Sequence, residues 1–404
     1  MKAYIHINEI LTLKKAHLKD GRKLNPEDLS IITDGAIVFD DKMILWVGHT
    51  GEMPEQYKSL PFMSLKDHVL TPEIVDSHTH LVFGGDRAKE YADRLNGIPY
   101  EEIAKRGGGI LLTMKETQNA GNEALFELAR ERIQRLYSYG IGTIEIKSGY
   151  GLNFEKEKEI SLVIARLKKH FSPQIQIFNT YLAAHDVPKE FSSSADYVKQ
   201  VVLPLLKELA PLNIIDAVDI FHEKNYFTAE DTRELFQLAL DLGIPRKIHA
   251  DELNTNGGAE IAASFSALSA DHLLKISDDG IAKLAHSATV ATLLPGTAFF
   301  LGKILAPSRK MLDAGVKVAI ASDYNPGSCH CDNLLLIASI SAAQLKINQA
   351  ELWCAITYNA SHSLGKMDQG VLVPGMKARF SLFKAESISH ITYNWGRNFS
   401  VSLP

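Results

Sequence analysis

The chain has 404 residues, of which 46% are hydrophobic and 23% charged, proportions that argue against a disordered, collagen-like or coiled-coil protein. Its 43 Lys and Arg residues and 48 Asp and Glu residues give a net charge of -5, so no nucleic acid is expected as a partner. Three cysteines, no signal-peptide pattern and no apolar stretch of bilayer length favour a cytoplasmic protein that does not enter a membrane.

Both ends of the chain have the composition of short strands. Residues 36–48 contain two β-branched or aromatic runs around an Asp-Asp turn. Residues 370–375 and 378–383 have the same character and are predicted to be strands joined by a Pro-Gly turn. We therefore expect residues 1–68 and 361–404 to build one small β-sandwich domain together.

Between these ends, residues 69–360 alternate short apolar runs with longer segments of helical period. Eight such repeats predict an α/β fold, a (β/α)8 TIM-type barrel. A doubly wound sheet is disfavoured, because no G-x-G-x-x-G follows the first run. The predicted strands are 69–76, 143–147, 175–182, 214–220, 246–249, 268–271, 290–294 and 316–321. The predicted helices include 122–138, 155–169, 195–209, 229–242 and 278–286.

Polar side chains gather at the ends of the predicted barrel strands, where the active sites of such barrels lie. The first strand ends in His78 and His80, which face the same way because residues two apart in an extended chain share a side. Later strands end in His249, in Asp271 and His272, and in Asp323. Each placement alone suits a surface hydrogen bond, but their coincidence on one rim predicts a metal site.

The types of these side chains narrow the metal and the chemistry. Three imidazoles and a carboxylate suit Zn²⁺ or Fe²⁺ better than Mg²⁺ or Ca²⁺, which prefer oxygen ligands. Such a site activates water for attack on a carbonyl or imine carbon. Glu252, three residues after His249, is placed to accept the proton of that water, and His272 is a candidate second base.

In their order along the chain, these residues resemble the amidohydrolase superfamily. Within it, the match is closer to the imidazolonepropionase family and extends from about residue 70 to residue 365. The segments that carry this resemblance are Asp76–Arg87 (DSHTHLVFGGDR), Gly107–Ile110 (GGGI), Glu145–Leu152 (EIKSGYGL), His249–Glu252 (HADE) and Asp323–Ser328 (DYNPGS).

The resemblance implies the third step of histidine degradation, in which water opens the ring of 4-imidazolone-5-propanoate to give N-formimidoyl-L-glutamate. It implies one Zn²⁺ or Fe ion per subunit and a homodimer, with Glu252 activating water, His272 assisting and Asp323 serving as both ligand and catalytic residue. Arg87 and Tyr150 would clamp the propionate, for which a guanidinium fork is well suited. The implied metal ligands are His78, His80, His249 and Asp323, and the implied substrate-binding residues are Arg87, Tyr150, His185, Asn325, Gly327 and Ser328.

Two other interpretations stay open. One is another cyclic-amide hydrolase or deaminase of the amidohydrolase superfamily, which would share the metal ligands and differ in the substrate loops. The other is a barrel that has lost catalysis and serves as a scaffold, which the complete set of ligands and bases disfavours.

A few residues fall outside the implied chemistry. Cys329 and Cys331 are interpreted as a reduced, partly buried pair, His222 as a packing residue near the site and His362 as structural. In the tail, Arg379 follows Ala378 where the family usually has an aspartate.

Overall fold

The apolar runs in the middle of the chain form one parallel sheet of eight strands, in a computed structural model that describes residues 1–98, 102 and 106–403. The strands are hydrogen-bonded in the order in which they follow one another along the chain, which confirms the predicted barrel. The strands are β6 (Ile74–Asp76), β7 (Ile141–Lys147), β8 (Gln176–Ala184), β9 (Ala217–His222), β10 (Lys247–Ala250), β11 (Ser269–His272), β12 (Val290–Leu293) and β13 (Val318–Ile320).

The barrel closes just beyond the ends of its first and last strands. The backbone N–H of Asp323 donates to the carbonyl oxygen of His78 at 3.0 Å, and that of His80 donates to Tyr324 at 2.9 Å. Thr79 and Tyr324 form a parallel bridge between these two hydrogen bonds. The closure therefore places the segments that follow β6 and β13 side by side at the carboxyl-terminal rim.

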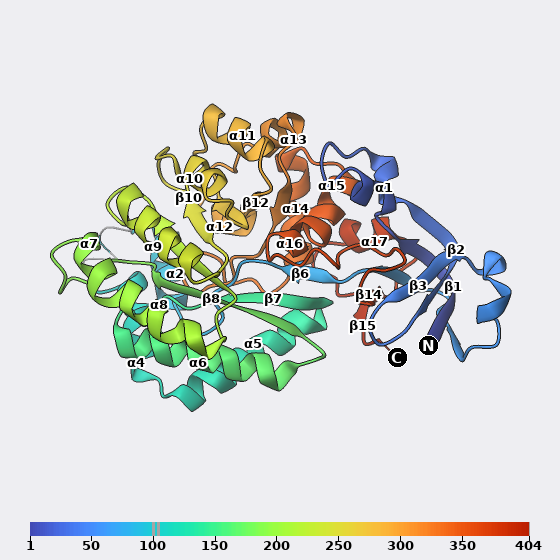
Figure 1. The fold of residues 1–404 in the computed structure, drawn as a ribbon, viewed down its shortest axis with the longest axis horizontal. Helices are drawn as coiled ribbons and strands as arrows, with labels where there is room; N and C mark the ends of the chain where they lie inside the picture. The colour runs from blue at the N-terminus through green and yellow to red at the C-terminus, as the bar shows by residue number, and fades with distance from the viewer. Residues whose placement is uncertain (99–101, 103–105, 404) are drawn as a thin grey trace.

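Helices surround the barrel, as Figure 1 shows. Four lie within two residues of the predicted bounds: α5 (Asn122–Ser138), α6 (Phe154–Phe171), α9 (Ala229–Asp241) and α11 (Asp278–Ala285). The predicted helix 195–209 is instead α7 (Ser194–Tyr197), a π-helical turn (Val198–Val202) and α8 (Leu203–Leu209). The π turn ends two residues before Pro204, which lacks a backbone donor. Of the described helices, none is long and apolar enough to cross a membrane. The others are α1 (Lys14–Leu18), α2 (Ala88–Leu95), α4 (Ile110–Asn119), α10 (Gly258–Ser264), α12 (Pro295–Phe300), α13 (Ser308–Ala314), α14 (Leu334–Leu345), α15 (Gln349–Ala355), α16 (Tyr358–His362) and α17 (Ile388–Tyr393).

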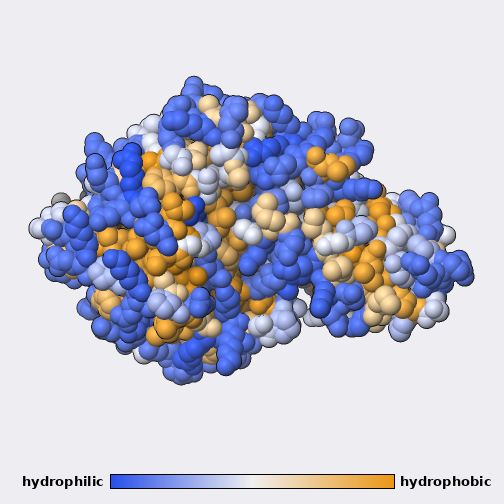
Figure 2. Space-filling view, in the orientation of Figure 1, coloured by the Kyte–Doolittle hydropathy of each residue, from blue (hydrophilic) through white to orange (hydrophobic). Residues whose placement is uncertain are grey.

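The two ends of the chain meet in a second, mixed sheet that projects from one side of the barrel (Figures 1 and 2). The expected small β domain from both termini is therefore present, and hydrogen bonds join its seven strands into one sheet rather than two stacked ones. The sheet has its own core, which includes Ile7, Ile37 and Leu382. Its strands are β1 (Lys2–Leu11), β2 (Ile31–Phe39), β3 (Ile44–His49), β4 (Phe62–Ser64), β5 (Val69–Pro72), β14 (Phe380–Phe383) and β15 (Ser400–Val401).

Two predicted strands are corrected by the structure. Residues 69–76 form two strands in different sheets, since β5 pairs with β1 and β14 while β6 pairs with β7. The change of sheet falls at Pro72, which has no N–H to continue a ladder, and at Glu73. Residues 370–375 form turns instead of a strand, because Gly370 and Gly375 both adopt a φ of 91°, which a strand does not allow.

The unusual Arg379 joins the terminal sheet to the barrel. Its Nη2 lies 2.7 Å from Oε2 of Glu73 and donates to the carbonyl oxygen of Gly142 at 3.0 Å. The Glu73 carboxylate also accepts a hydrogen bond from the Thr143 hydroxyl at 2.6 Å. The two charged side chains are only 15% and 9% exposed, so Arg379 is the partner that makes the buried Glu73 tolerable.

We expect Arg379→Met to lower the free energy of unfolding by about 3 kcal/mol, because it leaves a buried carboxylate without its cation. Urea denaturation followed by circular dichroism measures this change. Lys384→Ala, at an exposed position of the same segment, is the matched control and should have no effect. A loss of stability as small as that of the control would show that Arg379 does not join the two sheets.

Candidate active site

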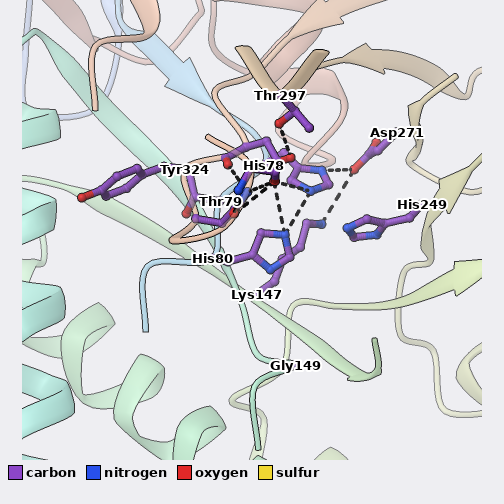
Figure 3. Close-up of polar contacts among 12 residues, drawn as sticks. His78, Thr79, His80, Lys147, Gly149, His249, Asp271, Thr297 and Tyr324 are labelled. Atoms are coloured by element: carbon purple, nitrogen blue, oxygen red, sulfur yellow. Dashed lines mark hydrogen bonds and ion pairs between the residues drawn. The ribbon is translucent and has the colours of Figure 1, made fainter. Parts of the chain in front are cut away.

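Three imidazoles meet at the carboxyl-terminal rim of the barrel. His78 and His80 follow β6, and His249 lies in β10. One ring nitrogen of each lies within 4.8 Å of the others, and the Nε2 atoms of His78 and His80 are 3.3 Å apart. Figure 3 shows the three rings around one point, with Lys147 beside them. All three are buried, so the cluster is not a chance gathering of surface histidines.

Asp323, which follows β13, adds a carboxylate to the cluster. Its Oδ1 lies 3.6 Å from Nε2 of His78 and 3.5 Å from Nε2 of His80. Its Oδ2 accepts a hydrogen bond from the hydroxyl of Thr297 at 2.5 Å, which fixes the orientation of the carboxylate. Asp323 has a φ of 52°, a left-handed conformation that is held here by the barrel closure. The structure thus brings together the four side chains that the sequence predicts as ligands.

The chemistry of these donors fits a metal cation. Burial and then the charge of Lys147 lower the pKa of His78, and burial lowers that of His80, so both rings are neutral bases. Burial would also lower the pKa of His249, but Asp219 raises it overall. Within the described part of the chain, Nε2 of His249 has no hydrogen-bond partner although it is buried. A cation bound there would satisfy that nitrogen and displace any proton on it.

Two further groups stand next to the imidazoles. Glu252 follows β10 and His272 ends β11, and Oε2 of Glu252 lies 3.7 Å from Nδ1 of His272. The His272 ring centre is 5.2 Å from that of His249 and 5.5 Å from that of His78. Glu252 also has Nζ of Lys303 at 4.0 Å from its Oε1. The predicted pair of proton carriers therefore lies beside the predicted metal ligands.

A cavity of about 510 Å³ opens above the cluster. Of the twelve site residues that the sequence predicts, only His78 does not line it, because His78 lies deeper in the barrel. The cavity walls also contain Arg94, Phe221 and Lys303, which the sequence reasoning did not single out. The predicted residues on its walls are His80, Arg87, Tyr150, His185, His249, Glu252, His272, Asp323, Asn325, Gly327 and Ser328.

The guanidinium of Arg87 is held in place before any ligand binds. Its Nε and Nη2 donate to Oε2 of Glu90 at 2.8 and 2.6 Å, and Oε1 of Glu90 accepts from the N–H of Gly109 at 2.9 Å. The third nitrogen, Nη1, packs against Gly327 so closely that a Cβ there would lie 2.1 Å from it. The ion pair with Glu90 and a place on the cavity wall are therefore compatible roles for Arg87.

Tyr150 and His185 form the wall next to His80. The His185 ring stacks on that of His80, with centres 5.0 Å apart and planes 11° apart. Nδ1 of His185 lies 3.0 Å from the carbonyl oxygen of Gly149, and burial lowers the pKa of His185 to about 3, so Nδ1 donates and Nε2 is an acceptor. Burial raises the pKa of Tyr150, which keeps its hydroxyl neutral and able to donate.

Asn325 shapes the loop that carries Gly327 and Ser328. Its Oδ1 accepts from the backbone N–H groups of both residues at 2.8 Å. Its Nδ2 donates to the backbone carbonyl oxygen of Asp323 at 2.7 Å, so the loop is tied to the backbone of that residue. The Asn325 side chain is thereby occupied by the loop itself, and Ser328 is the neighbour with a hydroxyl on the cavity wall.

The residues interpreted as structural keep other partners. Nδ1 of His222 lies 3.1 Å from the Thr232 hydroxyl, which agrees with a packing role. His362 lies 3.0 Å from Nζ of Lys317 at the opposite end of the barrel. Among the described residues, the groups with metal-binding geometry do not include Cys329.

Sequence reasoning missed a set of charged side chains buried beneath the imidazoles. Glu145, Lys147, Asp219 and Lys247 lie in barrel strands, are fully buried and, with Asp271, form a network of ion pairs. The sequence did contain a sign of this network, because these charged residues lie inside strands predicted to be buried. A buried charge needs a partner of opposite charge.

Comparison with known proteins decides the family. No protein-family model matches the chain. Imidazolonepropionase of Bacillus velezensis is 40% identical over 395 residues, which cover 97% of this chain and 93% of the relative. Imidazolonepropionase of Bacillus mycoides is 41% identical over 396 residues, covering 97% and 92%. The chain belongs to the imidazolonepropionase family.

Solved structures of other proteins have a similar fold. An adenosine deaminase from Xanthomonas campestris with bound zinc has a TM-score of 0.71 and covers 99% of this chain and 90% of its own. Atrazine chlorohydrolase from Arthrobacter aurescens complexed with zinc has a TM-score of 0.68 and covers 96% and 88%. Both are 16% identical to this imidazolonepropionase family member, so the likeness concerns the fold.

Proposed function

We propose that the protein hydrolyses 4-imidazolone-5-propanoate to N-formimidoyl-L-glutamate, the third step of histidine degradation. The observation that carries this proposal is the cavity, which has a guanidinium on its wall and an imidazole cluster at its floor, in a chain of this family. A ligand with a carboxylate at one end and a reactive ring at the other matches that arrangement. In the reaction, the oxygen of water bonds to the ring carbonyl carbon, the adjacent C–N bond breaks and a proton passes to the leaving nitrogen.

We assign the binding of one Zn²⁺ or Fe ion to His78, His80, His249 and Asp323. A bound ion would polarise the ring carbonyl and lower the pKa of water. The imidazoles suit this role because they are buried, because His78 and His80 are neutral, and because Asp271 and Asp219 accept hydrogen bonds from Nδ1 of His78 and of His249. Imidazole and carboxylate ligands bind both zinc and iron. Metal analysis of the purified protein identifies which of the two is bound.

Glu252 is assigned the transfer of the proton. It lies on the cavity wall beside His272, from which it is separated by 3.7 Å, and it can reach the space above the imidazoles. Glu252 would take a proton from the attacking water and deliver it to the leaving ring nitrogen. His272 would stabilise the charge that develops during the attack.

The substrate is held by the groups on the wall. Arg87 and the Tyr150 hydroxyl would bind the propionate, since the guanidinium is preorganised by Glu90 and the hydroxyl is neutral. His185 would accept a hydrogen bond from a ring N–H through Nε2, and Ser328 would contact the ring from the opposite loop.

The protein should rapidly remove the ultraviolet absorbance of freshly prepared 4-imidazolone-5-propanoate. Treatment with a chelator should abolish this activity, and addition of Zn²⁺ or Fe²⁺ should restore it, because the water must be activated at the imidazole cluster. A metal-loaded sample without turnover would contradict the substrate assignment and direct attention to other cyclic amides or to deamination.

Glu252→Gln should lower kcat by about 10²- to 10⁴-fold, because the amide cannot accept the proton of water. Metal content, measured by plasma mass spectrometry, should stay at the wild-type level, since Glu252 is not assigned as a ligand. Glu234→Gln, at an exposed position of α9, is the control and should behave as wild type. Loss of metal together with activity would make Glu252 a ligand instead of a base.

Arg87→Met should raise KM by about 10- to 100-fold, the loss expected for a charged hydrogen bond, with a smaller change in kcat. Arg87→Lys should give an intermediate KM, because it keeps the charge and loses the fork. Lys89→Ala, exposed on the same helix α2, controls for the overall charge. Steady-state kinetics measures KM and kcat for all three variants. An unchanged KM in Arg87→Met would contradict the assignment of Arg87 to propionate binding.

A further inference from the structure

Five charged side chains lie fully buried in the barrel core below the imidazole cluster. Nζ of Lys147 is 2.7 Å from Oδ2 of Asp219, 2.9 Å from Oε2 of Glu145 and 3.7 Å from Oδ2 of Asp271. Nζ of Lys247 is 3.0 Å from Oε2 of Glu145 and 3.8 Å from Oδ2 of Asp271. Each of these side chains has 0% exposure, so water contributes nothing to their stabilisation.

Two of the carboxylates connect this network to the imidazoles. Oδ2 of Asp271 lies 2.7 Å from Nδ1 of His78, and the Asp219 carboxylate lies 3.1 Å from Nδ1 of His249. A carboxylate that accepts from Nδ1 keeps the proton on that nitrogen and leaves the lone pair on Nε2. The carboxylates therefore decide which nitrogen His78 and His249 present to the metal position.

The carboxylates in turn depend on the lysines. Three buried carboxylates within reach of one another would repel, take up protons or turn away from the rings if no cation lay between them. Burial alone would lower the pKa of Lys147, but the attraction of Asp219, Glu145 and Asp271 raises it, so this side chain is a permanent cation. Lys247 is fixed further by donating to the carbonyl oxygen of Ser77 at 2.9 Å.

The same lysines occupy a region that otherwise has the ligands for a second ion. His78, Glu145 and Asp271 offer ligand atoms within 4.8 Å of one another. Both ammonium groups contact Glu145 and approach Asp271, so the negative charge that would attract a second cation is already balanced.

We propose that Lys147 and Lys247 are positioning residues, fixed cations that hold Asp219 and Asp271 against His249 and His78 and so prepare a site for a single metal ion. The inference rests on the metal site of the proposed function and deepens it. Neither lysine is assigned contact with substrate or with the metal. Their effect passes through the carboxylates to the orientation of the two rings.

The test measures Zn²⁺ binding to the metal-free protein by competition with a chromophoric chelator, with no substrate present. Lys147→Met should weaken Zn²⁺ binding by about 10- to 100-fold, the usual cost of losing support for a metal ligand. Lys317→Met is the matched control, because Lys317 is also buried and paired, with Asp20 and His362, at the opposite end of the barrel. It should bind Zn²⁺ as the wild type does.

A double variant keeps the test decisive if Lys147→Met fails to fold. Lys147→Met with Glu145→Gln removes one cation and one anion together, so the net charge of the core stays the same, but Asp219 still loses its contact with Lys147. We expect this variant to fold and to bind Zn²⁺ at least tenfold more weakly than wild type. Affinity within twofold of wild type in the folded double variant would overturn the proposal, as would two ions bound per wild-type chain.

These outcomes can be told apart from failure of the proposed reaction. A wild-type protein that binds one Zn²⁺ ion and does not open 4-imidazolone-5-propanoate would refute the substrate and leave the role of the lysines intact. A wild-type protein that binds neither Zn²⁺ nor Fe²⁺ would refute both.

Discussion

The ion pair between Lys147 and Asp219, 2.7 Å long and fully buried, is the interaction on which the site depends. A TIM barrel fills its interior with apolar side chains, and this barrel instead holds two ammonium groups and three carboxylates there. With all five ionised, the network has one excess negative charge directly below His78 and His249. Negative charge beneath the ring nitrogens favours a bound cation at the rim.

Barrel closure brings the remaining parts of the site to the same place. The hydrogen bonds between the segments after β6 and β13 put Asp323 next to His78 and His80, which are more than 240 positions earlier in the sequence. His272 and Asp323 both have positive φ, 77° and 52°, at the ends of their strands. Non-glycine residues in this conformation persist where surrounding structure holds them, and here they turn functional side chains toward the cavity.

The sequence predicted the barrel because short apolar runs alternate with segments of helical period. It predicted the side chains at the rim because each apolar run ends where polar residues begin, and that position marks the end of a strand. It did not predict the pairing of Glu145, Lys147, Asp219 and Lys247, because alternation places these charges inside strands without revealing which strands are neighbours across the barrel. Residues 69–76 looked like one strand because the change of sheet at Pro72 depends on pairing with β14, which lies about 300 residues later in the sequence. The boundaries at residues 68 and 360, the homodimer and the cytoplasmic location stay predictions, and strand pairing puts residues 69–72 in the terminal sheet.

The cavity has opposite electrostatic character at its two levels, and this polarity determines how a ligand can enter. Its walls hold three cationic side chains, Arg87, Arg94 and Lys303, against two acidic ones, Glu252 and Asp186, whereas Asp323 and the buried carboxylates lie at and below the floor. An anionic group is therefore attracted to the walls and repelled from the floor unless a cation is bound there. In the proposed reaction, this difference would help to orient a substrate with one carboxylate and a neutral ring, with its charged end toward Arg87 and its ring over the imidazoles. The buried charges that are proposed to support the metal ligands would then also contribute to specificity for such a molecule.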